Sequence, residues 1–182
     1  MIRKFIIFFI FFTFSAIPVK AQLDLEHWFP PFHIPKSYKP IPETAELYIS
    51  TPQEEDFKIR IYGGKSFLLE TTISRDKPLK FSVPFEHIFL SANLAMKVVD
   101  GGIYVAGEKS FFADMRISFS TNYTEIITSK GKSALGKNFY IGMGEQYLPN
   151  NAANINLLNA IASVIATENN TTIKLSGYNK DV

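Results

Sequence analysis

The sequence of 182 residues contains no cysteine. This absence excludes a disulfide framework, a thiol nucleophile, a thiolate metal site and an anchor made through a lipidated cysteine. Small exported eukaryotic modules usually depend on disulfides, whereas larger bacterial exported domains do without them. If the chain is exported, the absence of cysteine therefore favours a bacterial envelope or surface protein.

Recognisable catalytic and cofactor motifs are missing as well. The three histidines, His27, His33 and His87, do not follow the spacing of a zinc site. No Gly-x-Ser-x-Gly elbow occurs, and residues 129–136 (SKGKSALG) lack the residue order of a phosphate-binding loop. We therefore expect no catalytic residue, no cofactor, no metal site and no nucleotide partner.

The N-terminus has the pattern of a secretory signal peptide over residues 1–21. Arg3 and Lys4 form a basic start, residues 5–17 are almost wholly apolar, and small residues precede Gln22 at the exit. The apolar run of about thirteen residues is shorter than the roughly 20 that a membrane-spanning helix needs. We expect Sec-type export with cleavage before Gln22, in preference to a membrane anchor, and a periplasmic, cell-surface or extracellular location.

Cleavage at this point changes the charge of the protein. The full chain has 19 basic and 17 acidic residues. Arg3, Lys4 and Lys20 would leave with the signal peptide, which lowers the basic count to 16 and gives a formal charge of −1. A nearly neutral mature chain gives no support to nucleic-acid binding or to electrostatic binding of acidic membranes.

Residues 22–44 form a lead-in that is rich in proline and aromatic residues. Proline removes a backbone donor and disfavours helix at the residue before it, so this stretch should be extended. Its aromatic side chains should pack against a neighbouring sheet. If Trp28, Phe29 and Phe32 are instead exposed together, they would form a binding patch.

Residues 45–160 form one predicted β-rich domain. Short apolar runs alternate with turn sequences such as Gly63-Gly64, and no segment after residue 21 keeps a helical period. We expect an all-β fold, an antiparallel β-sandwich in preference to a propeller-like arrangement. The predicted strands are residues 45–50, 57–61, 66–74, 79–83, 95–99, 103–106, 111–120, 123–128, 161–167 and 171–175.

An internal echo relates the last predicted strand pair to an earlier one. Residues 48–63 and 164–177 each contain a strand ending in Thr, a polar connection, and an apolar–basic–apolar strand closed by Gly. The echo predicts that residues 161–182 begin a second repeat that the chain leaves incomplete. The alternative to a repeat is a chance match of short alternating strands. The loop at residues 168–170 is expected to be a structural turn; the alternative, a calcium site that also uses Asp181, would have too few oxygen ligands.

Several stretches resemble the N-terminal domain of IgGFc-binding-type proteins, in the form found in large surface proteins of Bacteroidetes. Residues 164–175 (VIATENNTTIKL) are close to the family's ATEDNTTVTI strand pair, and residues 128–139 (TSKGKSALGKNF) resemble its SKG…LG…F stretch. Residues 102–113 are similar to its GIxIxSxKPI element, although the lysine-proline is absent. With residues 27–31 (HWFPP), the resemblance spans most of residues 25–178 and implies a long surface protein with adhesin-like repeats.

These features together predict a non-enzymatic surface or secreted domain for adhesion or recognition, or the structural base of one. Its expected partner is a host or extracellular glycoprotein or polysaccharide. One alternative is an exported carbohydrate-active enzyme using Asp114, Glu125 or Glu145, which would need two carboxylates facing each other at about 5–10 Å. Another is a fragment without an independent role.

Overall fold

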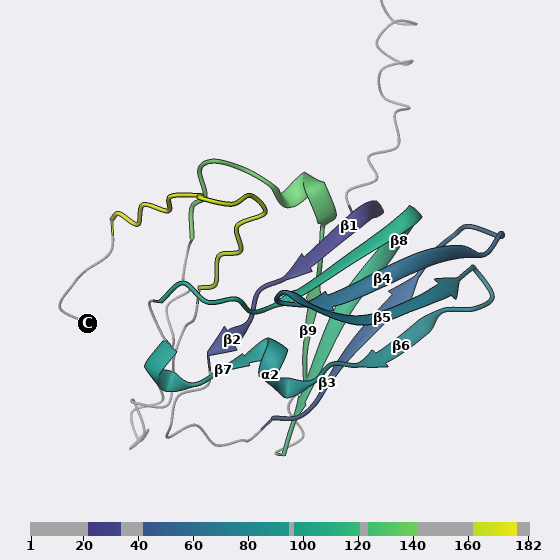
Figure 1. The fold of residues 1–182 in the computed structure, drawn as a ribbon, viewed down its shortest axis with the longest axis horizontal. Helices are drawn as coiled ribbons and strands as arrows, with labels where there is room; N and C mark the ends of the chain where they lie inside the picture. Colours follow the sequence, from purple (N-terminus) through teal and green to yellow (C-terminus); the bar gives the residue numbers. More distant parts are fainter. Residues whose placement is uncertain (1–21, 34–41, 95–96, 121–123, 142–161, 178–182) are drawn as a thin grey trace, which may run out of the picture.

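The fold was analysed in a computed structural model, which describes residues 22–33, 42–94, 97–120, 124–141 and 162–177. The predicted signal peptide, Glu145 and Asp181 lie outside the described residues. Seven strands form one curled antiparallel sheet (Figure 1), so the predicted all-β antiparallel class is confirmed. The strands are β1 (Asp24–Phe29), β3 (Pro42–Ser50), β4 (Phe57–Gly63), β5 (Ser66–Ile73), β6 (Leu79–Ser82), β8 (Ile103–Phe119) and β9 (Thr124–Thr128).

Smaller elements accompany the seven-stranded sheet. A short parallel pair joins β2 (Phe32–His33) to β7 (Phe89–Leu90), and one helical turn, α2 (Phe85–Ile88), precedes β7. Two 3₁₀ turns follow, η1 (Ala92–Leu94) and η2 (Gly131–Ala134). The turn η2 lies within the lysine- and glycine-rich residues 129–136, and no pattern in the sequence indicated α2.

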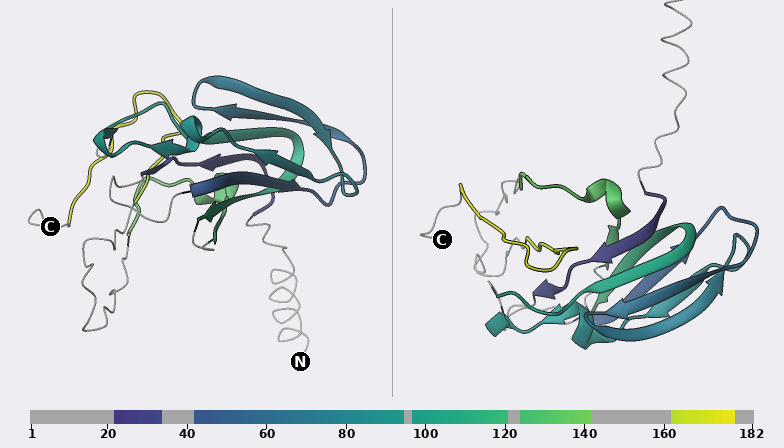
Figure 2. Two further views of the ribbon diagram at one scale, coloured as in Figure 1. Left: turned by 90° about the horizontal axis from the view of Figure 1, so that it is seen from below. Right: turned by 45° about the horizontal axis from the view of Figure 1, so that its top comes forward.

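The long strand β8 creates the curl. Its first part lies between β1 and β4, and its second part lies between β3 and β9 (Figures 1 and 2). The change of partners occurs between Gly107, opposite Ile59 of β4, and Phe112, opposite Ser50 of β3. A Cβ on Gly107 would lie 2.7 Å from the ring of Phe111, so only glycine leaves room for the ring at this bend. One strand thereby serves both halves of the sheet.

The concave side of the curled sheet holds a single apolar core. Alternate residues of β4 show the pattern: Phe57, Ile59 and Ile61 are buried, whereas Lys58 and Arg60 face solvent. Burying each large apolar side chain contributes roughly 1.5–3 kcal/mol. Other fully or nearly fully buried members are Phe29, Ala45, Leu47, Ile49, Ile73, Val83, Ile88, Ile103, Val105, Phe111, Ala113, Met115 and Ile117.

The predicted lead-in is part of the sheet. Residues Asp24–Phe29 pair with β8 as an edge strand, and Pro42 already belongs to β3. A proline-rich stretch can supply an edge strand because one side of such a strand needs no ladder hydrogen bonds. The boundary drawn at residue 44 therefore does not separate a lead-in from the folded domain.

The predicted hairpin of residues 95–99 and 103–106 is wrong. Residues 97–102 are not in a strand, and residues 103–119 form one strand where two were predicted. The physical reason is that β1 and β4 occupy both edges of residues 103–106, which leaves no edge for another strand. Val98 accordingly lies fully exposed.

The predicted strands of residues 161–167 and 171–175 are also absent from the described residues 162–177. The turn between them is confirmed: Asn170 has a φ of 60°, and the Thr171 hydroxyl donates a 2.8 Å hydrogen bond to the carbonyl of Glu168. The Ser163 hydroxyl donates a hydrogen bond to the carbonyl of Pro31. Residues 172–175 alternate polar and apolar side chains, but within the described residues the segment 162–177 pairs with no strand, and alternation alone does not make one. The second repeat remains a prediction.

Candidate functional site: an aromatic and charged sheet face

The face of β1, β8, β4 and β5 that points away from the core carries the chemistry-bearing side chains; we call it the outer face. Directly opposed residues of antiparallel strands project on the same side. The register therefore sets two parallel rows across the four strands. The first row is Trp28, Tyr104, Tyr62 and Phe67, and the second is Glu26, Ala106, Arg60 and Glu70.

The first row is aromatic throughout, and we call it the aromatic row. The rings of Trp28 and Tyr104 stack with centroids 5.5 Å apart, and those of Tyr104 and Tyr62 stack at 5.8 Å. Phe67 meets Tyr62 edge to face at 5.7 Å. Each such pair contributes roughly 0.5–1.5 kcal/mol beyond the area it buries. The row therefore stabilises the pairing of four strands from their solvent side.

Phe67 differs from the other three rings in its exposure and in its angle. Trp28, Tyr104 and Tyr62 are half-buried because their faces cover one another, whereas Phe67 is 58% exposed. A β-bulge in β5 places Phe67 opposite Tyr62. Without the bulge Tyr62 would pair with Leu68, which packs against the core. The end of the aromatic row thus presents a phenyl ring to solvent.

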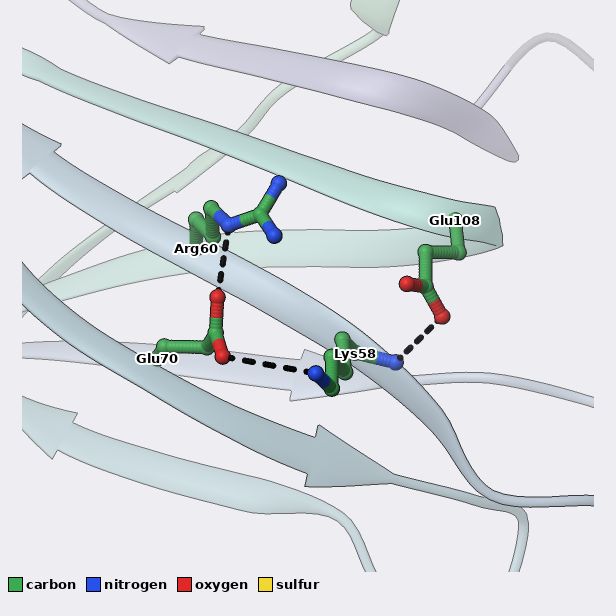
Figure 3. Close-up of polar contacts among 4 residues, drawn as sticks. All are labelled: Lys58, Arg60, Glu70 and Glu108. Carbon is green, nitrogen blue, oxygen red and sulfur yellow. Dashed lines mark hydrogen bonds and ion pairs between the residues drawn. The ribbon is translucent and has the colours of Figure 1, made fainter.

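A charged network lies beside the aromatic row (Figure 3). The Nε of Arg60 donates to the carboxylate of Glu70 at 2.6 Å, and the Nζ of Lys58 lies 3.7 Å from the same carboxylate. The backbone N–H of Lys58 donates to Glu108 at 3.1 Å. The hydrogen bond between Arg60 and Glu70 lowers the pKa of Glu70 and raises the pKa of Arg60. All four side chains are solvent-exposed.

At the other end of the second row, Glu26 joins the aromatic row to η2. Its carboxylate accepts a hydrogen bond from the Tyr104 hydroxyl and forms an ion pair with Lys132, whose Nζ lies 2.5 Å away. The hydrogen bonds from Lys132 and then Tyr104 lower the pKa of Glu26 against a smaller opposing effect of burial. Burial, with the bond to Glu26, raises the pKa of the Tyr104 phenol. Tyr104 therefore stays neutral and acts as a donor.

The lysine- and glycine-rich stretch holds the edge strand β1 in place. Ser129 is buried, and its hydroxyl accepts from the N–H groups of Trp28 and Gly131, both at 3.3 Å. Gly131 has a φ of 56°, and a Cβ there would lie 2.4 Å from the Cβ of Asp24. The N–H of Lys132 donates to Asp24 at 2.6 Å. Residues 129–132 thus fix the position of β1 through these hydrogen bonds.

The three residues of the predicted aromatic patch do not share one surface. Phe29 is fully buried, because it alternates with Trp28 along β1 and points into the core. Phe32 packs against the core and contacts the ring of Phe89 at 6.3 Å. Of the predicted patch only Trp28 reaches the outer face, where its ring neighbour is Tyr104.

The histidines do not gather at a site. His27 is fully buried; its Nε2 donates to the carbonyl of Phe111 at 2.8 Å, and its Nδ1 has no hydrogen-bond partner in the described part of the chain. Desolvation lowers the pKa of His27, although nearby backbone carbonyls and the charge of Asp24 oppose this. The His87 ring packs over Gly63, where a Cβ would lie 2.4 Å from it. Among the described residues no group of three or more His, Asp or Glu is placed to hold a metal.

Asp114 and Glu125, the two described carboxylates of the alternative enzyme, do not face one another. Asp114 pairs with Thr128, whereas Glu125 pairs with Ile117, which points into the core. Residues 114 and 117 of one strand project to opposite faces, so the side chains of Asp114 and Glu125 do as well. A shallow open depression of about 340 Å³ lies elsewhere, beside the ion pairs Arg75–Glu54 and Lys109–Glu55.

Sequence reasoning missed most of the outer face. The alternation of β4 did predict that Lys58 and Arg60 face solvent. The partners Tyr104, Phe67 and Glu70 come from strands whose register depends on the bend in β8 and the bulge in β5. Gly107 marks the bend in β8 but does not reveal the strand partners on either side of it, and no local pattern marks the bulge in β5.

Comparison with protein-family models, curated proteins and solved structures found none that matches this chain. The resemblance to IgGFc-binding-type proteins therefore stays a prediction. None of the helices within the described residues has the length and apolar character needed to cross a bilayer.

Proposed function

We propose that this chain is an exported, non-enzymatic recognition module that binds an extracellular glycoprotein or polysaccharide through its outer face. The observation that supports this is the aromatic row, in which four aromatic residues from four strands lie on the side of the sheet opposite the core. Apolar surface exposed on a sheet face can mark a contact site, and the row ends in Phe67, whose ring is 58% exposed. The sheet provides a rigid base, since its other face is closely packed core.

The proposal also draws on the predicted signal peptide and the resemblance to large adhesin-like surface proteins. A curled sheet with one face buried and one face decorated suits recognition, because ligand contacts can vary without disturbing the core. The face would act by itself or as the first part of a longer surface protein.

The test uses protein produced from the full coding sequence and purified after export. Binding is measured to immobilised mucin, immunoglobulin Fc and an array of oligosaccharides, for wild type and for Phe67→Ala. The matched control is Phe139→Ala, because Phe139 is equally exposed at 61% but lies outside the sheet. We expect a ligand whose binding falls in Phe67→Ala and not in Phe139→Ala. Equal binding by all three proteins, or none by any, would contradict the proposal.

A further inference from the structure

We infer that the outer face binds a neutral oligosaccharide, with Phe67 as the stacking platform and Arg60 and Glu70 as the hydrogen-bonding pair beside it. This inference rests on the proposed function and names the chemistry of its ligand. A sugar ring has an apolar face of C–H groups and an edge of hydroxyls. A site for it needs one accessible aromatic ring next to fixed donors and acceptors.

Phe67 meets the first requirement. The stacked rings of Trp28, Tyr104 and Tyr62 offer mostly their edges, because each face is covered by a neighbour. Phe67 is the terminal ring, is turned 69° from Tyr62 and has a single ring neighbour among the described residues. Its phenyl group is therefore the part of the aromatic row open to C–H contact from a sugar ring.

Arg60 and Glu70 meet the second requirement. Arg60 lies on β4 two residues from Tyr62, and Glu70 lies opposite Arg60 on β5. Both side chains therefore project on the same face as Phe67, in the row next to the aromatic row. Arg60 uses Nε for Glu70, and within the described residues its two Nη groups have no acceptor. In Figure 3 the guanidinium end projects over the sheet on the side away from Glu70. The pair thus offers a fixed fork of donors and a carboxylate acceptor to vicinal hydroxyls.

Charge balance selects a neutral ligand. The ion pairs on this face join three basic side chains (Lys58, Arg60, Lys132) to two acidic ones (Glu26, Glu70). A third carboxylate, Glu108, accepts from the backbone N–H of Lys58 and balances the charge. A face with no net charge has no long-range attraction for nucleic acids or for strongly acidic polysaccharides. It retains many oriented donors and acceptors, which complement a polyol.

The test compares neutral and uronic- or sialic-acid-containing oligosaccharides on an array, followed by calorimetry of the best neutral ligand. Phe67→Ala should weaken binding about fivefold to tenfold, and Arg60→Met about tenfold because a charged hydrogen-bond donor is lost. Phe139→Ala and Lys65→Met serve as controls and should leave binding unchanged. Affinity should stay constant between low and physiological salt, since no net charge is neutralised.

Binding only of acidic glycans, with steep salt dependence, would overturn the inference. So would neutral-glycan binding that both Phe67→Ala and Arg60→Met leave intact. If Fc or the mucin polypeptide binds in a Phe67-dependent way while every neutral glycan fails, the inference is overturned and the proposed function stands. If no ligand of any class shows Phe67-dependent binding, both fail.

Discussion

Lys132 Nζ lies 2.5 Å from Oε2 of Glu26, and this ion pair ties the turn η2 to the edge strand that begins the aromatic row. The same glutamate also accepts from Tyr104 in the middle of that row. Removing the ammonium therefore loosens β1 and leaves Glu26 with one partner fewer.

For Lys132→Met we expect a lower thermal midpoint and faster amide exchange in β1. The control is Lys65→Met, which removes an ion pair with Asp100 whose side chains are 83% and 67% exposed. Pairs as exposed as this contribute little. An equal fall in midpoint for the two variants would argue that the ion pair of Lys132 does not stabilise β1.

Gly131→Ala tests whether the close backbone approach of residues 129–132 to β1 stabilises the fold. An alanine at a φ of 56° with a Cβ 2.4 Å from Asp24 should cost about 1–3 kcal/mol of unfolding free energy. Gly177 is the matched control, because its φ is 75° and no atom lies within 4 Å of its Cβ position. Gly177→Ala meets the same left-handed backbone strain without the clash, so it should lower the unfolding free energy less than Gly131→Ala does. An equal loss for the two variants would contradict the steric account.

Acid should destabilise the fold through His27. Burial lowers the pKa of His27 in the folded chain, so below about pH 6.5 the unfolded chain binds a proton that the folded chain does not. Stability linked to this group is therefore complete above pH 6.5 and is lost as the pH falls, by at most about 1.4 kcal/mol per pH unit.

His27→Gln keeps a donor for the carbonyl of Phe111 but cannot titrate. We expect its unfolding free energy to change less between pH 7 and pH 5 than that of wild type, as measured by urea denaturation. Parallel curves for the two proteins would show that His27 does not carry the pH dependence.

Export with cleavage before Gln22 is a further expected outcome. N-terminal sequencing or intact mass of the protein recovered from the extracytoplasmic fraction should give a chain that starts at Gln22. A full-length chain retained in the membrane fraction would contradict the predicted signal peptide.

The all-β class followed from the sequence because turn residues and alternation are local. Strands such as residues 57–61 and 66–74 were predicted within one or two residues of β4 and β5. The turn at Gly64, where φ is 56°, was marked by its glycine pair. Short-range chemistry was sufficient for these elements.

The errors involve long-range pairing. Residues 95–99 have the apolar content of a strand, but β1 and β4 already flank the segment they would pair with. The sequence predicted packing for Phe29 but left a surface patch with Trp28 and Phe32 as the alternative, because a run of aromatic residues does not reveal which members face the core. The site at Phe67 depends on a bulge that brings it opposite Tyr62, and its composition gave no indication of this.

The most direct test of the account is residue-level mapping of a bound ligand by NMR on the exported protein. Once a mucin-derived glycan or other ligand has been found to bind, titration should perturb the amides of Tyr62, Phe67 and Glu70 first, with smaller changes at Tyr104. Perturbation confined to residues 135–141 or 162–177, with the outer face unchanged, would contradict it.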